Sequence, residues 1–149
     1  MSIKKISVMV IAGLMALGVV ASVAQDAFVA PATPEEAVTL RKQLMKEDGG
    51  ILRGAASLTG PEAVAAMQTL KDNYSHIPAL FPEGSIVGDS EALPAIWENW
   101  DAFVAIAKTG EDAAAAGLAS AEAGDAAGYA AALQAIGGTC GTCHQQFRS

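Results

Sequence analysis

The chain has little cysteine and no clear strand pattern. Among its 149 residues there are only two cysteines, and both lie in one five-residue stretch near the C-terminus. No cysteine is left elsewhere to form a disulfide that would hold the fold together. No run of β-branched and aromatic residues alternates strictly along the chain, which argues against a β-sheet. Alanine, the best helix former, is abundant, so the sequence predicts an all-α fold.

Positive charge is also scarce. The chain carries nine Lys or Arg against sixteen Asp or Glu, which gives a formal net charge of −7. Nucleic-acid binding depends on basic contacts to phosphates, so we expect no nucleic-acid partner. An acidic surface suits a basic protein partner, and it also keeps a protein soluble whatever its partners are.

The five-residue stretch consists of Cys140, Gly141, Thr142, Cys143 and His144. The pattern C-x-x-C-H is the attachment sequence of a c-type haem, in which two thiols add across the vinyl groups and the histidine becomes an axial iron ligand. On a helix, residues at i, i+3 and i+4 share one face, so all three functional side chains would meet one porphyrin. Only five residues follow the motif, and any second protein ligand must therefore come from upstream.

Two other kinds of site use similar residues. A thioredoxin-like redox disulfide expects a βαβ context and a helix N-terminus that lowers a thiol pKa. Here the cysteine pair ends a predicted helix, and no strand signal precedes it. A structural zinc site needs about four ligands, and only the distant His76 could complete this set. The sequence therefore favours one covalently attached haem c.

The N-terminus has the pattern of a secretory signal peptide. Lys4 and Lys5 form a basic start, residues 8–20 form an uncharged apolar run, and small residues at 22–24 suit cleavage before Gln25. A membrane anchor is the alternative, but the run is shorter than the about 20 residues that a spanning helix needs. We expect residues 1–24 to be removed and residues 25–149 to form one periplasmic domain with a formal net charge of −9.

Capping and breaking residues divide this domain into four helices. The first begins at the T-x-x-E capping box of residues 33–36 and extends to about Leu58. The second begins at residues 59–62 and ends before Pro78. After a loop over residues 78–90, a third extends from about Pro94 to about Ala123, and a fourth capped by Asp125 carries the haem motif. Four helices with one longer connection predict an antiparallel four-helix bundle.

Apolar stripes on these helices indicate where the haem lies. On the fourth helix one stripe recurs at spacings of three and four and includes both cysteines: Tyr129, Leu133, Ile136, Cys140, Cys143 and Phe147. On the third helix Trp97, Trp100 and Val104 form a bulky face. We expect this face to pack in the core and Trp97 to lie against the porphyrin.

The second iron ligand has three candidates, Met45, Met67 and His76. Met67 lies in an apolar stripe, where methionine usually fills the core. His76 lies beside Pro78, where a solvated or capping role is expected. Met45 has Arg41 one turn before it, and this pair would suit a haem, with sulfur near iron and guanidinium near a propionate. From the residues alone, Met45 as a ligand and Met45 as packing both stay open.

Several segments together resemble class II c-type cytochromes, the cytochrome c prime family. They are residues 40–46 (LRKQLMK), 80–85 (LFPEGS), 94–97 (PAIW) and the C-terminal C-x-x-C-H, and the resemblance covers roughly residues 33–149. It implies an antiparallel four-helix bundle with the haem near one end. Phe147 stands where the family usually has a tyrosine, which implies the loss of one hydrogen bond at the end of the bundle.

The family contains two functional types that differ at one distal position. High-spin members leave the iron five-coordinate and bind nitric oxide or carbon monoxide, whereas low-spin members place a methionine there and carry electrons. Counted from Arg41, this position is Met45, which resembles the low-spin type.

The resemblance therefore implies an electron carrier with His144 and Met45 as axial ligands, and a gas-binding protein is the alternative. We expect no enzyme, because no general acid, general base or second cofactor motif is visible. Redox proteins are the expected partners, and the mature chain should not insert stably into a membrane. A homodimer is an option, since many family members pair through their first two helices.

Overall fold

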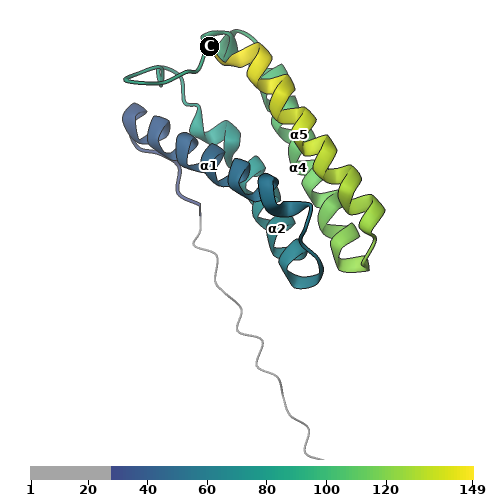
Figure 1. Cartoon of the computed structure of the whole chain (residues 1–149). Helices are drawn as coiled ribbons and strands as arrows, with labels where there is room; N and C mark the ends of the chain where they lie inside the picture. The colour runs from purple at the N-terminus through teal and green to yellow at the C-terminus, as the bar shows by residue number, and fades with distance from the viewer. Residues whose placement is uncertain (1–27) are drawn as a thin grey trace, which may run out of the picture.

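The computed structural model describes residues 28–149, and the predicted signal peptide and its cleavage site lie outside them. Four long helices make up most of this part: α1 (Pro34–Ala55), α2 (Gly60–His76), α4 (Trp100–Ala123) and α5 (Ala126–Phe147). A 3₁₀ turn, η1 (Ile77–Leu80), and a short helix, α3 (Ala95–Glu98), lie on the connection between α2 and α4 (Figure 1). Within residues 28–149 the only β-type pairing is an isolated bridge between Ala92 and Arg148. The predicted all-α four-helix bundle is confirmed.

The helix ends follow local signals in the sequence. At the start of α1 the hydroxyl of Thr33 accepts a hydrogen bond from the Glu36 amide at 3.2 Å. The Asp125 carboxylate accepts bonds from the Ala127 and Gly128 amides at the start of α5. Gly124 ends α4 in the left-handed conformation, with φ of 70°. The predicted starts of α1 and α5 and the predicted stop at Gly124 are therefore confirmed.

The predicted third helix is interrupted, which changes the face that it buries. Asn99 leaves helical geometry, with φ of −130° and ψ of 44°. Its side-chain amide donates to the Ala95 carbonyl at 3.2 Å, so it competes with the helical backbone bonds. The prediction that Trp100 packs in the core is consequently wrong, because this residue is 36% exposed. The buried face instead comprises Ile96 of α3 and Phe103, Ala107, Gly110, Ala114 and Gly117 of α4.

Small residues on α4 let it pack closely between α2 and α5. A Cβ atom on Gly110 would lie 1.9 Å from Cε1 of Tyr74, and one on Gly117 would lie 2.6 Å from Sδ of Met67. Met67 is fully buried here, so its predicted role as core packing is confirmed. The interface between α2 and α4 therefore needs glycine at these two positions.

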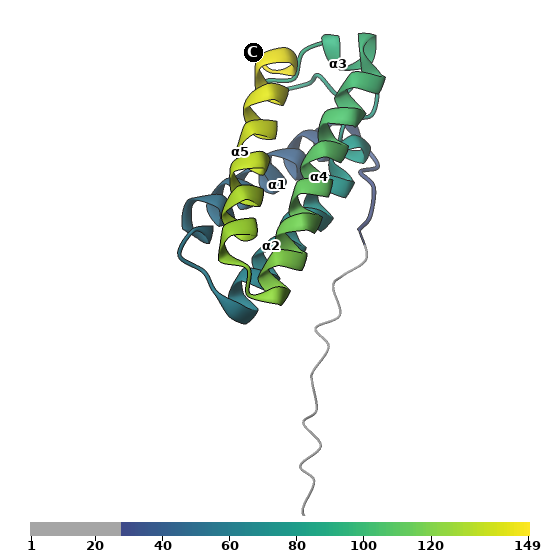
Figure 2. The ribbon, with the colours of Figure 1, turned by 90° about the vertical axis from the view of Figure 1, so that its right-hand side faces the viewer.

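Helix α1 is placed differently from the other long helices. It packs on α2 and η1 and makes far fewer contacts with α5 than α4 does. Figures 1 and 2 show α4 and α5 running side by side, with α1 set apart from the C-terminal half of α5. Across residues 28–149, no helix combines the length and apolarity needed to cross a bilayer.

Candidate functional site

Two adjoining cavities lie between α1 and the C-terminal half of α5. The first, here called the Arg41 cavity, has a volume of about 330 Å³, and the second, the Asp48 cavity, has a volume of about 250 Å³. Four residues line both: Met45, Phe103, Cys143 and His144. The two cavities therefore meet where the sequence predicts the haem iron.

The α5 wall presents the attachment motif. Both thiols are free and partly buried, and they lie in the last two turns of the helix. Cys140 lines the Asp48 cavity, where its sulfur lies 3.1 Å from the Tyr74 hydroxyl. Burial and the neighbouring Cys140 raise the pKa of Cys143 to about 11, so this thiol is neutral at physiological pH.

His144 presents a neutral imidazole to the cavities. Burial lowers its pKa first, and the charge of Arg148 lowers it further, while Glu91 acts in the opposite direction. A neutral imidazole has a nitrogen lone pair, which is the form that ligates a metal. The C-x-x-C-H side chains thus lie together on one wall, as the helical spacing predicts.

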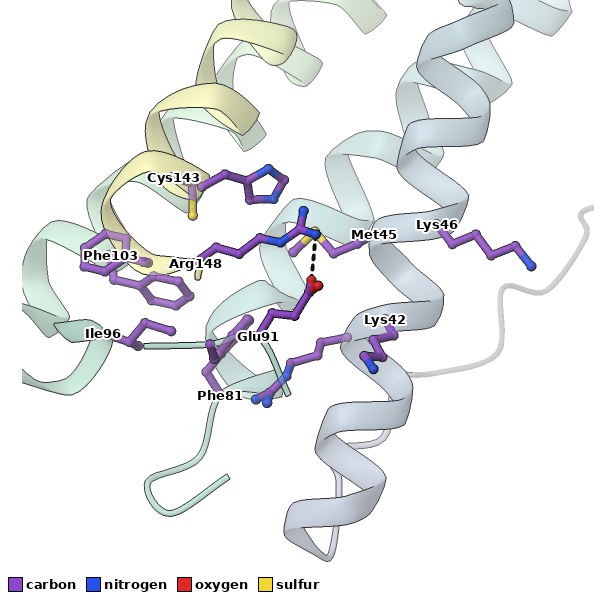
Figure 3. Close-up of a pocket in the computed structure, with 13 residues that line it drawn as sticks. Lys42, Met45, Lys46, Phe81, Glu91, Ile96, Phe103, Cys143 and Arg148 are labelled. Carbon is purple, nitrogen blue, oxygen red and sulfur yellow. Dashed lines mark ion pairs between the residues drawn. The ribbon is translucent and has the colours of Figure 1, made fainter. Parts of the chain in front are cut away.

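Met45 reaches into the same space from α1. Figure 3 shows it extending from α1 toward Cys143, and Lys46 on the next position also lines the cavity. Neither Met67 nor His76 is among the residues that line the two cavities. Met67 is in the core between α2 and α4, and the His76 ring stacks on Phe28 with 4.0 Å between ring centroids. Of the three candidate ligands, Met45 alone lies opposite the motif.

Arg41 is a buried cation that lines the first cavity. Its guanidinium donates to the Ser85 hydroxyl at 3.0 Å, to the Ser85 carbonyl at 2.7 Å and to the Ser90 hydroxyl. It also lies 4.7 Å from the centre of the Phe81 ring. These partners are all uncharged, and burial lowers the pKa of Arg41. Because a buried charge without a counterion is unfavourable, this corner of the cavity suits an anionic group.

The contacts of Arg41 with Ser85 and Ser90 were not predicted from the sequence. They lie on the loop after η1, and their hydroxyls together with a backbone carbonyl tie this loop to α1. The LFPEGS segment drew attention to the loop but not to its partner, because Arg41 and Ser85 are 44 positions apart in the sequence.

Surface ion pairs border the Arg41 cavity. Arg148 pairs with Glu91, with 2.6 Å between the charged atoms, and this pair is drawn in Figure 3. Lys42, which also lines the cavity, pairs with Asp89 on the loop after η1. Such exposed pairs stabilise little on their own, so the buried Arg41 contacts are the stronger link between α1 and the loop.

The structure gives Trp97 a different role from the expected one. It does not line either cavity, and its indole N–H donates to the Phe81 carbonyl at 3.1 Å. The aromatic wall is formed by Phe81, Phe103 and Phe147, whose rings meet edge to face at 4.9 and 5.4 Å between centroids. The small buried residues of α4 recur at spacings of three and four from Gly117 back to Ala107. Extending this pattern by one more turn toward the N-terminus of the helix reaches Phe103, so the sequence could have indicated this residue.

The alternatives to haem attachment find no support in the described part of the chain. The cysteine pair ends a helix instead of beginning one, so no helix N-terminus lowers a thiol pKa. Residues 28–149 hold no group of three or more His, Cys, Asp or Glu side chains arranged for a metal ion. Neither a redox disulfide nor a zinc site matches this geometry.

The residues that line the two cavities fit a haem c. Each cavity is mostly apolar, and their volumes approach or reach the range typical of small-molecule sites. Two thiols and a neutral imidazole lie on one wall, and a thioether lies on the other. Arg41 adds a buried cation that has no charged partner among residues 28–149. This donor set matches an iron porphyrin with acidic side chains.

Comparisons with known proteins agree with this site. Residues 33–148 match the family model described as Cytochrome C'. A cytochrome c-556 of Agrobacterium tumefaciens (strain II Chrys) is 44% identical over 119 residues, which cover 74% of this chain and 95% of that protein. A cytochrome c' of Rhodospirillum rubrum is 35% identical over 149 residues, covering 95% of this chain and 97% of that protein.

Solved structures resemble the whole bundle. Cytochrome c' from Thermochromatium tepidum matches with a TM-score of 0.72 and 23% identity, over 79% of this chain and 98% of that one. A nitric oxide complex of a variant of cytochrome c prime from Alcaligenes xylosoxidans matches with a TM-score of 0.68 and 27% identity, over 80% and 98%.

Proposed function

The chain belongs to the cytochrome c' family of haem proteins, and on this basis we propose that it is a periplasmic one-electron carrier with His144 and Met45 as axial iron ligands. Proteins of this family carry one covalently attached haem c. The observation that carries the proposal is the position of Met45, which lines both cavities opposite His144. In this proposal Cys140 and Cys143 hold the haem through thioether bonds.

The haem supplies an iron that takes up or gives off one electron, and the chain sets how easily it does so. His144, held neutral by burial, would donate a nitrogen lone pair, and Met45 would donate a thioether sulfur. Met/His ligation raises the reduction potential relative to other axial ligand pairs. Two protein ligands keep the coordination shell the same in both oxidation states, which suits fast electron transfer.

Arg41 supports the same proposal from the end of the cavity. Within residues 28–149 its guanidinium donates hydrogen bonds to serine oxygens alone, and it lines the same cavity as Met45, His144 and Cys143. We assign it to a haem propionate, which would provide the carboxylate that this buried cation lacks. The serine contacts would hold the guanidinium in place before the haem arrives.

Gas binding is the second candidate, and one observation favours it. The matching structure from Alcaligenes xylosoxidans is a nitric oxide complex, so a protein of this fold at 27% identity binds a diatomic gas. In that case Met45 would only pack over the distal side and leave one coordination position open. His144, Cys140 and Cys143 would keep their roles in both candidates.

Replacing Met45 distinguishes the two. If Met45 ligates iron, Met45→Ala should convert the ferrous haem from low-spin to high-spin and greatly accelerate carbon monoxide binding, measured by absorption spectroscopy and stopped flow. Met67→Ala is the matched control, because Met67 lines neither cavity and its loss should cost only packing, about 2–5 kcal/mol. Equal spectra for the wild type and Met45→Ala would refute ligation by Met45.

A further inference from the structure

A buried carboxylate lies beside the proposed haem position and has no assigned role. Asp48 is on α1, one turn beyond Met45, and lines the Asp48 cavity together with Met45, Tyr74 and Cys140. Its residue is 4% exposed. In residues 28–149 it forms no ion pair, and its carboxylate accepts a hydrogen bond from the Asn73 side-chain amide at 2.7 Å. A buried carboxylate normally has a cation or several donors, so this one is poorly compensated.

Among residues 28–149, the groups around Asp48 do not supply positive charge. On its own helix, the exposed Glu47 accepts a bond from the same Asn73 amide at 3.1 Å and adds a second carboxylate. From α2, the neighbouring titratable group is the Tyr74 phenol, which is neutral because burial raises its pKa. From α5, Cys140 and Cys143, which would be uncharged thioethers once the haem is attached, line the same cavity, and His144 lines it as a neutral imidazole.

These surroundings favour the protonated form of Asp48. Burial raises its pKa most, the Asn73 hydrogen bond lowers it, and the charge of Glu47 raises it again, to about 6. A carboxyl group in this range is partly ionised near neutral pH, so a small change of nearby charge changes its proton occupancy.

We propose that Asp48 is a redox-linked proton site, which takes up one proton from solvent when the haem accepts one electron and releases it when the electron leaves. This proposal rests on the electron-carrier function above. The electron comes from the redox partner, and the proton bonds to a carboxylate oxygen of Asp48, so the added negative charge in the cavity is balanced. The two charges attract across a poorly polarisable interior, where Coulomb interactions are stronger than in water.

The coupling is reciprocal. If reduction makes Asp48 more basic, protonation of Asp48 must make reduction easier by the same free energy. The Asn73 amide links Asp48 to the exposed Glu47, so the polar cluster extends from the cavity to the surface, where protons are available.

Redox titration against pH tests this proposal directly. The midpoint potential of the wild-type holoprotein should fall as pH rises through the range around pH 6, by up to about 59 mV per pH unit for one electron and one proton. Asp48→Asn, which keeps an acceptor for Asn73, should hold the potential near the acidic plateau of the wild type at all pH values. Glu47→Gln removes only the exposed neighbouring charge. It should keep a pH-dependent potential but move that dependence to lower pH, because the Glu47 charge raises the pKa of Asp48.

A potential that depends on pH in the same way in Asp48→Asn as in the wild type would overturn the proposal. If Asp48→Asn does not incorporate haem, infrared difference spectra of the unmodified holoprotein decide. The reduced-minus-oxidised spectrum should gain the carbonyl stretch of a protonated carboxylic acid, and its absence across this pH range would also overturn the proposal. High-spin wild-type haem would instead refute Met45 ligation, so the two failures are distinguishable.

Discussion

At the scale of single residues, α1 places two buried charges on one face with a thioether between them. Arg41, Met45 and Asp48 recur at spacings of four and three, and Arg41 and Asp48 each line one of the two cavities. Buried charges destabilise a protein unless they are paired or hydrogen-bonded. Their position beside the cavities therefore fits a protein whose folded state is completed by a charged cofactor.

Replacement of Arg41 tests its assignment to a propionate. Arg41→Leu removes a positive charge near the haem, which favours the more positive ferric state, so the midpoint potential should fall. The spin state should not change, because Arg41 donates no ligand. Arg53→Leu, on an exposed position of the same helix, is the matched control and should leave the potential unchanged. An unchanged potential in Arg41→Leu would show that the guanidinium does not face the haem.

The sequence could indicate some of these residues and not others. The C-x-x-C-H motif carries its own chemistry, and the pair of Arg41 and Met45 was visible because one helical turn separates them. Asp48 could not be separated from the exposed Glu47 beside it, since only the packing of α1 against α2 decides which carboxylate is buried. Trp97 was expected beside the porphyrin as part of a bulky face, and Phe103 was not predicted, because the non-helical Asn99 changes which side of the third helix is buried.

At the scale of elements, local signals predicted helix ends better than helix faces. The caps at Thr33 and Asp125 involve residues two or three positions apart, so the sequence contains the whole interaction. The break at Asn99 has no glycine or proline to mark it, and a side-chain contact with Ala95 accompanies it. The close approach of α2 and α4 depends on Gly110 and on the Tyr74 ring, 36 residues away in sequence.

The glycine at this crossing can be tested by adding one methyl group. Gly110→Ala would place a Cβ atom 1.9 Å from the Tyr74 ring, so we expect the holoprotein to lose about 1–3 kcal/mol of unfolding free energy. Gly138→Ala on α5 is the matched control, because no atom beyond its own stretch of helix backbone lies within 4 Å of the position that a Cβ would take. It should gain up to about 1 kcal/mol from helix propensity. Chemical denaturation measures both, and equal effects would contradict the packing argument.

At the scale of the whole molecule, the helices pack closely on one side of the bundle and leave cavities on the other side. Helix α4 packs closely between α2 and α5, whereas α1 leaves two cavities against α5. The sequence predicted four antiparallel helices and their order, since helix periodicity and connection lengths determine these features. It could not predict the cavities, because their shape depends on how far α1 stands from α5.

We predict that the haem is bound covalently to the polypeptide. If Cys140 and Cys143 form thioether bonds, acid–acetone extraction should leave the haem on the polypeptide of the wild-type protein. Replacing both cysteines by serine keeps the size of the side chains, and any haem that this variant binds should be extracted. Mass spectrometry of the protein before and after extraction makes the comparison. Complete loss of haem from the wild type would contradict c-type attachment.

Axial ligation by His144 and Met45 is tested most directly by the absorption spectrum of the wild-type holoprotein, recorded oxidised and reduced, with and without carbon monoxide. The structure places Met45 opposite the attachment motif in both cavities. We therefore predict low-spin spectra in both oxidation states and weak or slow carbon monoxide binding, because the gas must first displace a thioether. A high-spin ferrous spectrum with rapid carbon monoxide binding would contradict this ligation and favour the gas-binding function.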